Sequence, residues 1–431
     1  MRIAFITSGA AGMFCGSCMR DNTLVAALRR LGHDALLIPT YTPIRTDEAD
    51  VSESRVFFGG INVYLEQKTW LFRHTPWLFD RLLNFNRLLR WVSRFAVRTP
   101  YSELGALTVS MLRGSHGKQW KEVARLTGWL AKHIRPEAVI LSNALLSGAL
   151  PELKRALAAP IFITLQGDDI FLEALPAKDR AICHDLIRGN DAAVTGYICT
   201  SRYYADFMAG YLGIDRVKMH VIHPGLNLAG HSERPVRSEP VPAIGYFARI
   251  CPEKGFHNLV DAFIRLRQDS TAQPCRLLAS GWLGDNNRAY FEEQRRKLAA
   301  ASLSDEFTHV ECPTHDDKVR FLHSIDVLSV PTTYHEPKGL YVLEAWANGI
   351  PVVQPRHGSF PELIEAAAGG LLVPPNDAAA LAGALRQMLV DGELRSRLGR
   401  SGAAAVRDRF TAEAMAKQTA AVLERFANPA T

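Results

Sequence analysis

Short apolar runs of strand length alternate with longer helical stretches along the whole chain. Most of these runs are continuously apolar rather than strictly alternating, which is typical of parallel strands covered on both faces. The pattern predicts two α/β halves, each with its own doubly wound, Rossmann-like sheet. The predicted strands are RIAFITS, DALLIP, AVILSN, IFITLQ, YICTS and KMHVIHP, followed by AIGYFARI, CRLLASG, FTHVEC, DVLSVPTT, PVVQP and GLLVPP.

A polar, proline-rich stretch separates the two halves. Residues 231–242, HSERPVRSEPVP, show no periodicity, which indicates an interdomain linker. The domains are therefore predicted at 1–230 and 243–410, and the last helical stretch, at about 411–431, could cross back to the first domain. Two such domains would face a central cleft at the carboxyl ends of both sheets, where open α/β sheets bind ligands.

Composition and charge narrow the class of protein. The chain has 431 residues, 47% of them hydrophobic, which is enough for two or three domains with cores of their own. It contains no apolar run of about 18 residues and begins without signal-peptide architecture, so we expect a cytoplasmic location. The net charge of +6 is spread along the chain. Nucleic acid is therefore not an expected partner, and attraction for phosphate or an anionic membrane is the simpler interpretation.

Seven scattered cysteines do not indicate a disulfide framework. Cys15 and Cys18 form one close pair, which could be a redox motif or half of a zinc site. Zinc needs two further ligands, and no second Cys or His pair at finger spacing follows in the sequence. Small residues beside a glycine-rich turn explain the pair equally well, so we predict neither a metal site nor a cofactor.

The clearest chemistry lies in HEPKGLYVLEAWANGIPVV, residues 335–353. Glu336 follows a predicted strand, in a loop at the carboxyl edge of the second sheet. Gly339 and Leu340 open the next helix, whose unpaired N–H groups can bind phosphate. Glu344 lies about one turn further on, among mainly apolar residues. It could bind sugar hydroxyls there, or it could pair with the helix dipole on a solvated edge.

Two cations precede this stretch, at the carboxyl end of the second domain's first strand. Arg249 ends that strand, and Lys254 stands in the turn before the next helix. Charge-assisted contacts to phosphate are worth roughly 1.5–3 kcal/mol each. Together the two side chains could neutralise a diphosphate leaving group without Mg²⁺, although a lone pair of cations could also be plain surface charge.

These residues resemble the retaining glycosyltransferases of GT-B fold, the large group (glycosyl transferases group 1) that includes bacterial glycogen synthase and sucrose synthase. The resemblance rests on Glu336 and Glu344 with a Gly-Leu step between them, on Arg249 and Lys254-Gly, and on EAWANGIPVV. Other stretches agree in order and spacing, namely IHPGLN, LLASGWL, HDDKVRFLHSIDVLSVPTT and SFPELIE. The match covers the second domain closely. It covers the first domain loosely, through the glycine-rich turn and LRRLGHDALLI.

The resemblance implies an activity and a role for each matching residue. The activity is transfer of a hexose, with retention and without metal, from a nucleoside-diphosphate sugar to a glycan or lipid-linked acceptor. Arg249 and Lys254 would hold the diphosphate, and Glu336 would orient the hydroxyls of the sugar. In a front-face, oxocarbenium-like step the departing phosphate would accept the acceptor's proton. The other implied donor contacts are Gly12 and Gly16 over the diphosphate, the Gly339 and Leu340 amides on phosphate, Glu344 on the ribose, and Gly281 and Cys312 beside the base.

Two positions depart from the family's pattern. Lys338 stands where the family usually has Phe, so an additional cation would enter the donor pocket. Gln166 stands where the first domain often carries His, so a titrating group is missing there. The nearby Asp168 could bind acceptor or sugar hydroxyls, or it could cap the next helix.

Residues 64–98 interleave tryptophan and phenylalanine with arginine. Such helices suit an anionic membrane surface, which would fit a lipid-linked acceptor and a peripheral location on the inner membrane face. The alternative is a helical insertion that packs on the first domain and walls the acceptor groove.

Other functions fit parts of the same sequence. An NAD-dependent oxidoreductase is suggested by GAAGMFCG after the first strand, but the G-x-G-x-x-G spacing and the acidic residue after the second strand are missing. A GT-B-type epimerase or phosphorylase would share the cleft. A non-catalytic sugar-nucleotide-binding protein would keep only the binding residues, and the intact set of Glu336, Glu344, Arg249 and Lys254 argues against it.

Overall fold

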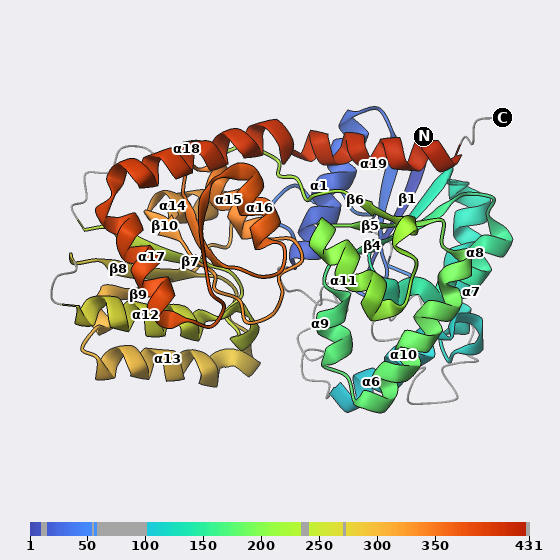
Figure 1. The fold of residues 1–431 in the computed structure, drawn as a ribbon. Helices are drawn as coiled ribbons and strands as arrows, with labels where there is room; N and C mark the ends of the chain where they lie inside the picture. The colour runs from blue at the N-terminus through green and yellow to red at the C-terminus, as the bar shows by residue number, and fades with distance from the viewer. Residues whose placement is uncertain (10–14, 54–55, 58–100, 234–240, 270–272, 428–431) are drawn as a thin grey trace. The chain divides into compact units, whose positions relative to one another are not determined.

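The computed structural model describes residues 1–9, 15–53, 56–57, 101–233, 241–269 and 273–427, which form two compact units (Figure 1). The first unit comprises Met1–His223 and Ala412–Thr431, and the second comprises Pro224–Thr411. From the sequence, the first of these boundaries is predicted at 230. Residues 224–230 belong instead to the second unit because Leu226 forms a bridge to Thr411 and packs in its core.

The first unit contains a parallel six-stranded sheet in the order β2-β1-β3-β4-β5-β6. Its strands are β1 (Arg2–Thr7), β2 (Asp34–Pro39), β3 (Ala138–Leu141), β4 (Ile161–Leu165), β5 (Gly196–Cys199) and β6 (Met219–Val221). Its helices are α1 (Gly16–Arg30), α6 (Tyr101–Leu112), α7 (Trp120–Trp129), α8 (Leu150–Ala156), α9 (Asp168–Glu173), α10 (Ala177–Asn190), α11 (Arg202–Leu212) and α19 (Ala412–Ala427).

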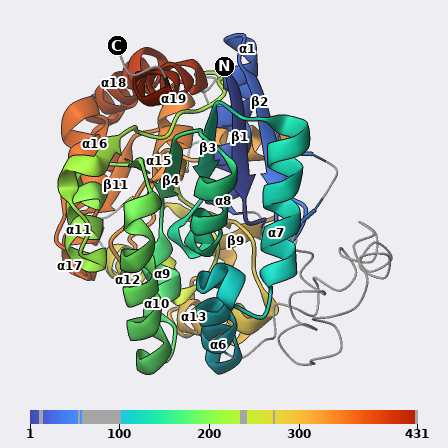
Figure 2. The ribbon, with the colours of Figure 1, turned by 90° about the vertical axis from the view of Figure 1, so that its right-hand side faces the viewer.

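Both faces of this sheet are buried, as its apolar strands predict. In β1, Ala4 and Ile6 join a core with α6, α7, α8, α10 and α11, whereas Ile3 and Phe5 join a second core with α1 and α19 (Figure 2). The C-terminal helix α19 therefore packs beside α1, and an ion pair of 2.8 Å joins Arg30 to Glu413.

The second unit contains a parallel six-stranded sheet in the order β12-β11-β10-β7-β8-β9. Its strands are β7 (Ala243–Phe247), β8 (Arg276–Ser280), β9 (Phe307–Val310), β10 (Val327–Leu328), β11 (Val352–Pro355) and β12 (Gly370–Val373). Its helices are α12 (Phe256–Gln268), α13 (Arg288–Ala300), α14 (His315–His323), α15 (Leu340–Ala347), α16 (Phe360–Ala367), α17 (Ala378–Val390) and α18 (Gly392–Arg409). Eleven of these twelve strands lie within the stretches predicted from sequence, and β5 begins one residue before its predicted stretch, at Gly196. The predicted two-sheet α/β architecture is therefore confirmed.

The order of the second sheet decides where its functional loops meet. The chain runs from β7 toward β9 in one direction and from β10 toward β12 in the other, so the topological switch point lies between β7 and β10. Helices α12 and α13 lie on one face of the sheet, and α15, α16 and α18 lie on the other (Figure 1). Loops that leave the carboxyl ends of β7 and β10 are therefore neighbours, and such switch points are where open α/β sheets bind ligands.

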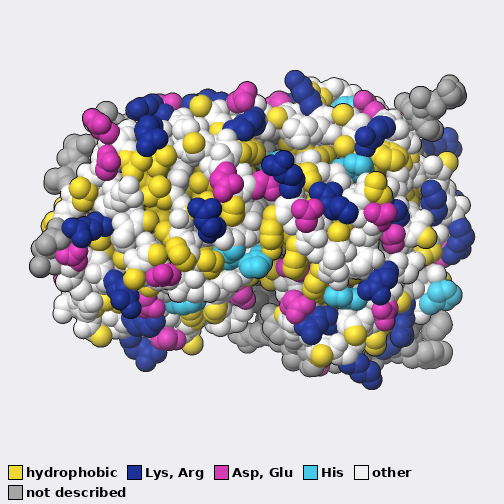
Figure 3. Space-filling view, in the orientation of Figure 1, with side chains coloured by type: hydrophobic (Ala, Val, Ile, Leu, Met, Phe, Trp, Pro, Cys, Tyr) yellow, Lys and Arg dark blue, Asp and Glu magenta, His cyan; other side chains and the backbone are white. Residues whose placement is uncertain are grey.

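Some of the sequence predictions concern residues outside the described ranges, and others concern membrane-spanning helices and surface charge. Gly12 and the segment 64–98 are not among the residues described. Among the helices that are described, none has the length and apolar character needed to cross a bilayer. On the face drawn in Figure 3, basic and acidic side chains are interspersed over each unit, so the positive charge is not gathered into one patch there.

Candidate active site

Glu336 lies at the centre of a buried polar cluster at the carboxyl edge of the second sheet. It stands in the loop between β10 and α15 and is only 2% exposed. Gly358 lets a neighbouring loop approach this position closely, because a Cβ atom there would lie 2.6 Å from the Glu336 backbone nitrogen. The Ser359 N–H donates to the Glu336 carbonyl at 2.8 Å, which fixes the loop further.

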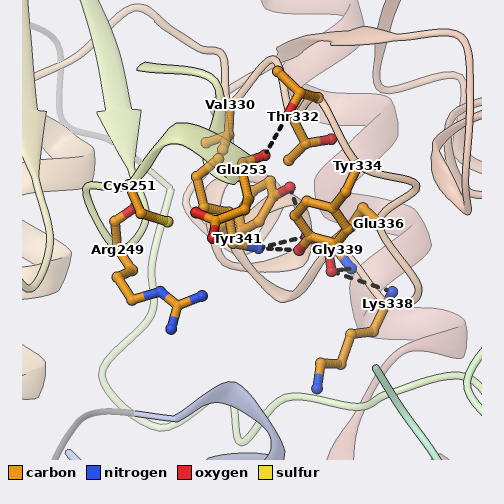
Figure 4. Close-up of polar contacts among 12 residues, drawn as sticks. Arg249, Cys251, Glu253, Val330, Thr332, Tyr334, Glu336, Lys338, Gly339 and Tyr341 are labelled. Atoms are coloured by element: carbon orange, nitrogen blue, oxygen red, sulfur yellow. Dashed lines mark hydrogen bonds and ion pairs between the residues drawn. The ribbon is translucent and has the colours of Figure 1, made fainter. Parts of the chain in front are cut away.

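The Glu336 carboxylate accepts hydrogen bonds from side chains and from backbone (Figure 4). Its Oε2 lies 2.6 Å from the Lys254 ammonium and also accepts from the hydroxyls of Tyr334 and Tyr341. Its Oε1 lies 3.3 Å from the Gly339 nitrogen and 3.4 Å from the Lys338 nitrogen. A buried carboxylate with this many donors is held in one orientation.

The charges in this cluster are set by burial and by close partners. Burial acts to raise the pKa of Glu336, but the Lys254 ammonium, the hydrogen bonds from Lys254 and Tyr334, and the nearby Lys338 together lower it to about 2. Burial, reinforced by Glu336, raises the pKa values of Tyr334 and Tyr341 well above their usual range. At neutral pH, Glu336 is therefore an anion, and the two neutral tyrosines donate hydrogen bonds to it.

The lowered pKa of Glu336 predicts acid-sensitive stability. In the unfolded chain this carboxyl titrates near 4.5, and in the folded chain it titrates near 2. Its stabilising effect is therefore present above pH 4.5 and is lost as the pH falls toward 2. Over this pH window, the unfolding free energy of wild type should fall by about 3 kcal/mol more than that of Glu336→Gln. Urea unfolding at a series of pH values measures both.

The control for this pH series is Glu365→Gln, at an exposed ion pair with Arg356. Its stability should follow the wild-type curve as the pH falls. Parallel curves for wild type and Glu336→Gln would contradict the assignment of an ionised Glu336.

Lys254 reaches Glu336 because two loops make a close backbone contact. Lys254 ends a short 3-10 helix, Pro252–Lys254, that leaves β7. The next residue, Gly255, has φ +70°, and a Cβ atom on it would lie 1.8 Å from the Pro331 carbonyl oxygen after β10. Only glycine permits both the left-handed backbone and this approach. The Lys254 ammonium also bonds the Tyr334 hydroxyl and lies 5.1 Å from the centroid of the Tyr341 ring.

Arg249 and Lys338 are placed differently from Lys254. Both side chains extend away from the Glu336 carboxylate and toward the same side of the view (Figure 4). Arg249 is exposed and follows β7, where its carbonyl accepts a 3.0 Å hydrogen bond from Tyr246. Of the two cations predicted to hold the diphosphate, Lys254 therefore lies inside the cluster and Arg249 lies beside it. Lys338 is a third cation beside the cluster.

The start of α15 and Glu344 lie one turn apart. Gly339 is the N-cap of α15, with φ +61°, and every residue of the helix after Leu340 is buried. Glu344 is 6% exposed, and its Oε1 lies 2.9 Å from the ammonium of Lys318 on α14. Glu344 is therefore neither on a solvated edge nor surrounded only by apolar groups.

Gly281 follows β8, which lies beside β7, and Cys312 follows β9, the edge strand beyond β8. Gly281 comes directly after β8 with φ +144°, and a Cβ atom on it would lie 1.8 Å from the Ala248 carbonyl oxygen. This glycine therefore lets the loop after β8 pass close to the residue before Arg249. Cys312 comes two residues after β9 and is half-buried, and burial raises the pKa of its thiol.

Three candidate residues lie in the first unit, namely Gly16, Gln166 and Asp168. Gly16 is the first residue of α1. Gln166 is buried, and its amide donates to Asp21 at 3.2 Å and to the Ser142 carbonyl at 3.0 Å. The Asp168 carboxylate accepts from the backbone N–H of Ala144 at 2.6 Å and from that of Gln166 at 3.0 Å.

Asp168 thus joins the end of β4 to the segment after β3. The N-cap of α9 is Gly167, without a side-chain cap, so the capping role considered from the sequence is not what this carboxylate does. Burial raises the pKa of Asp168 to about 6, although the N–H groups of Gln166 and Ala144 act to lower it.

These contacts predict that Asp168 is needed for stability. Asp168→Ala removes the acceptor of two buried N–H groups, and we expect it to lower the unfolding free energy by about 2 kcal/mol, measured by urea unfolding. The control Asp206→Ala removes an exposed carboxylate paired with Arg216 and should have little effect. A large fall in turnover with unchanged stability would instead indicate that Asp168 contacts substrate.

Two family models match the chain and divide it much as the structure does. The model described as glycosyl transferases group 1 matches residues 231–405, and the glycosyl transferase 4-like domain matches residues 22–225. This chain belongs to the group 1 glycosyltransferases of GT-B fold.

Curated relatives of this group 1 glycosyltransferase are similar over part of their length. The putative colanic acid biosynthesis glycosyltransferase WcaL of Escherichia coli (strain K12) is 33% identical, over 41% of this chain and 44% of its own. A D-inositol 3-phosphate glycosyltransferase of Corynebacterium efficiens is 28% identical, over 52% of this chain and 54% of its own. The chain spans about half the length of these curated relatives.

Solved structures match this group 1 glycosyltransferase along almost its whole length. Alr3699/HepE of Anabaena, in complex with UDP, has a TM-score of 0.68 and 17% identity, covering 98% of this chain and 100% of that one. Sucrose-phosphate synthase of Thermosynechococcus elongatus has a TM-score of 0.70 and 19% identity, covering 99% of each chain. At these identities the likeness shows the fold alone.

Three residues of the site did not stand out in the sequence. Tyr334 and Tyr341 flank Glu336 by two and five positions, and only their hydroxyl contacts with its carboxylate mark them. Lys318 lies within an amphipathic helix, four positions before the buried Leu322. The sequence could have marked Lys318 only as a lysine on the apolar face of a helix. It could not have shown the partner of this lysine, because Glu344 lies 26 positions away.

Proposed function

We propose that this chain is a retaining hexosyltransferase that needs no metal, uses a nucleoside-diphosphate sugar and acts on a glycan or lipid-linked acceptor. The observation that carries the proposal is the buried Glu336–Lys254 pair beside the start of α15, at the switch point of the second sheet. It combines an ionised carboxylate with a cation and with a helix N-terminus that favours phosphate.

The cluster suits the two halves of such a donor. Glu336 would accept hydrogen bonds from hydroxyls of the transferred sugar. A lysine ammonium has three N–H donors, of which Glu336 and Tyr334 engage two, so the third would reach a phosphate oxygen. Arg249 and the first amides of α15 would hold the rest of the diphosphate and stabilise the charge that develops as it leaves.

The names of relatives support the substrate classes. Alr3699/HepE of Anabaena has been crystallised with UDP and with UDP-glucose, which supports a nucleotide-sugar donor. WcaL of Escherichia coli is named for colanic acid biosynthesis and LpsE of Rhizobium meliloti for lipopolysaccharide core biosynthesis, which supports an acceptor of the cell-envelope glycan class. A lipid-linked acceptor would bring the enzyme to an anionic membrane. Comparing its flotation with anionic and with neutral liposomes tests this binding.

The test of the proposal is turnover with a panel of UDP-, GDP- and ADP-sugars. Nucleotide release is measured with and without EDTA, in wild type and in Glu336→Gln. Slow hydrolysis of one donor, unaffected by EDTA and lost in the variant, is the expected result. The anomeric proton coupling of a transferred product, read by NMR, then reports retention. Absence of both binding and turnover with every donor would overturn the proposal, and loss of activity in EDTA would overturn its metal independence.

A further inference from the structure

Two cysteines meet at the start of α1. Cys15 is the N-cap residue, with extended backbone at φ −116° and ψ 119°, and Cys18 is the third residue of the helix. Side chains at these two positions face each other across the first helical turn, as they do in a capping box. The Cys15 carbonyl accepts from the Met19 N–H at 3.0 Å, which holds Cys15 against the helix. The two residues between the cysteines, Gly16 and Ser17, are small.

Both thiols lie at the same core of the first unit, but they differ in exposure. Cys18 is 3% exposed and belongs to the core that α1 and α19 form with the sheet, and the half-buried Cys15 packs against that core. The Cys18 thiol shares a hydrogen bond with the Cys15 sulfur. Sulfur atoms in such contact can form a disulfide with little movement of the backbone.

The described ranges add no metal ligands to this pair. They contain no group of three or more His, Cys, Asp or Glu side chains that could hold a metal ion. The chemistry on the page is therefore that of two neighbouring thiols.

The two positions favour different protonation states. The hydrogen bond with Cys15, burial, and the charges of Cys15 and Asp21 raise the pKa of Cys18 well above its usual range, although a hydrogen bond with Thr7 acts to lower it. Cys15 stands at a helix N-terminus, where partial positive charge favours a thiolate, and the first turn of α1 contains no acidic residue that would oppose it. The proton is therefore lost first from Cys15, the more exposed of the two thiols.

We propose that Cys15 and Cys18 form a redox-active dithiol that a low-molecular-weight disulfide oxidises to a reversible intramolecular disulfide. The Cys15 thiolate attacks one sulfur of the oxidant, so that a mixed disulfide forms, the S–S bond of the oxidant breaks and one thiolate leaves. Cys18 then loses its proton and attacks the Cys15 sulfur, which forms the Cys15–Cys18 bond and releases the second thiolate. The two cysteine protons end on the two released thiols, and the two electrons reduce the oxidant. This reaction is separate from glycosyl transfer and does not depend on the proposed function.

Treatment of the reduced full chain with glutathione disulfide tests this chemistry. Wild type is expected to lose two of its seven free thiols and two hydrogen atoms in intact mass, and to keep no glutathione. Peptide mapping should place the new bond between Cys15 and Cys18, and dithiothreitol should restore both thiols. In Cys18→Ser the reaction should stop after the first step, with one glutathione on Cys15. In Cys15→Ser the buried Cys18 should react at least about tenfold more slowly than Cys15 does in wild type.

The matched control is Cys312→Ser, which removes the other half-buried cysteine and should form the disulfide at the wild-type rate. Circular dichroism of each reduced variant checks folding, and Cys18→Ala serves if a serine at this buried position prevents it. Retention of all seven thiols in wild type, or a glutathione adduct on Cys15 that Cys18 does not displace, would overturn the inference. Loss of two thiols in folded Cys15→Ser would overturn it as well, because the bond would then join other cysteines.

Discussion

Replacing Lys254 with methionine should lower kcat/KM for the nucleotide-sugar donor about 1000-fold. The Lys254 ammonium is held 2.6 Å from Glu336 in a buried cluster, where a positive charge acts strongly on a phosphate that gains charge as it leaves. Most of the loss is expected in kcat, since the interaction strengthens in the transition state. Steady-state kinetics with the donor found in the panel would measure it.

The same substitution leaves the buried Glu336 carboxylate without its cation, so its effect on stability needs separate controls. Without Lys254 the pKa of Glu336 should rise, because the attraction of that ammonium is the main influence that opposes burial. The double variant Lys254→Met/Glu336→Gln removes the unpaired carboxylate as well. It should fold well, and its kcat/KM should stay low. Lys297→Met, at a partly exposed ion pair, should leave kcat/KM nearly unchanged. A Lys254→Met enzyme with about a tenth or more of the wild-type kcat/KM would contradict the assigned role.

Replacing Trp346 with alanine should lower the unfolding free energy by about 3–5 kcal/mol. Trp346 is fully buried, and its indole N–H donates to the Gly369 carbonyl at 2.9 Å. The ring lies against two glycines, since a Cβ atom on Gly369 or Gly402 would come within 2.5 Å of it. Alanine would leave a large cavity together with a buried carbonyl that has lost this donor. Urea unfolding of the full chain measures the change.

Trp120 offers a matched tryptophan control. It is 44% exposed, so Trp120→Ala should change the unfolding free energy by less than about 1 kcal/mol. Because Trp346 anchors the helix that begins at Leu340 and carries Glu344, Trp346→Ala should also weaken nucleotide binding at temperatures where the chain stays folded. A loss of less than about 1 kcal/mol in Trp346→Ala would show that the core closes around the gap.

Much of the fold followed from local patterns. The apolar runs marked all twelve strands, because strands covered on both faces must be apolar almost throughout. Gly339 and Leu340 were predicted to open a helix, and they do, because a glycine readily adopts the left-handed backbone at that boundary. The glycosyltransferase family could also be predicted from the sequence, since each of its motifs is a short stretch and the stretches follow one another in the expected order.

Contacts between distant segments were not predictable in the same way. The sequence placed Asp168 either on a substrate or on a helix start, whereas its carboxylate binds the N–H of Ala144, 24 positions earlier. Glu344 was expected among neutral neighbours, yet it pairs with Lys318 from another helix. A short-range pattern carries no information about which partner a buried charge meets, because that depends on how the elements pack.

By itself, the sequence determined the two α/β halves, their strands and the residue types that suit a nucleotide sugar, since burial and helix ends leave local signatures in the chain. Only the tertiary structure decided that Lys254 meets Glu336, 82 positions away. The physical reason is the strand order, in which β10 lies beside β7, so that the loops from their carboxyl ends come together although the chain between them is long.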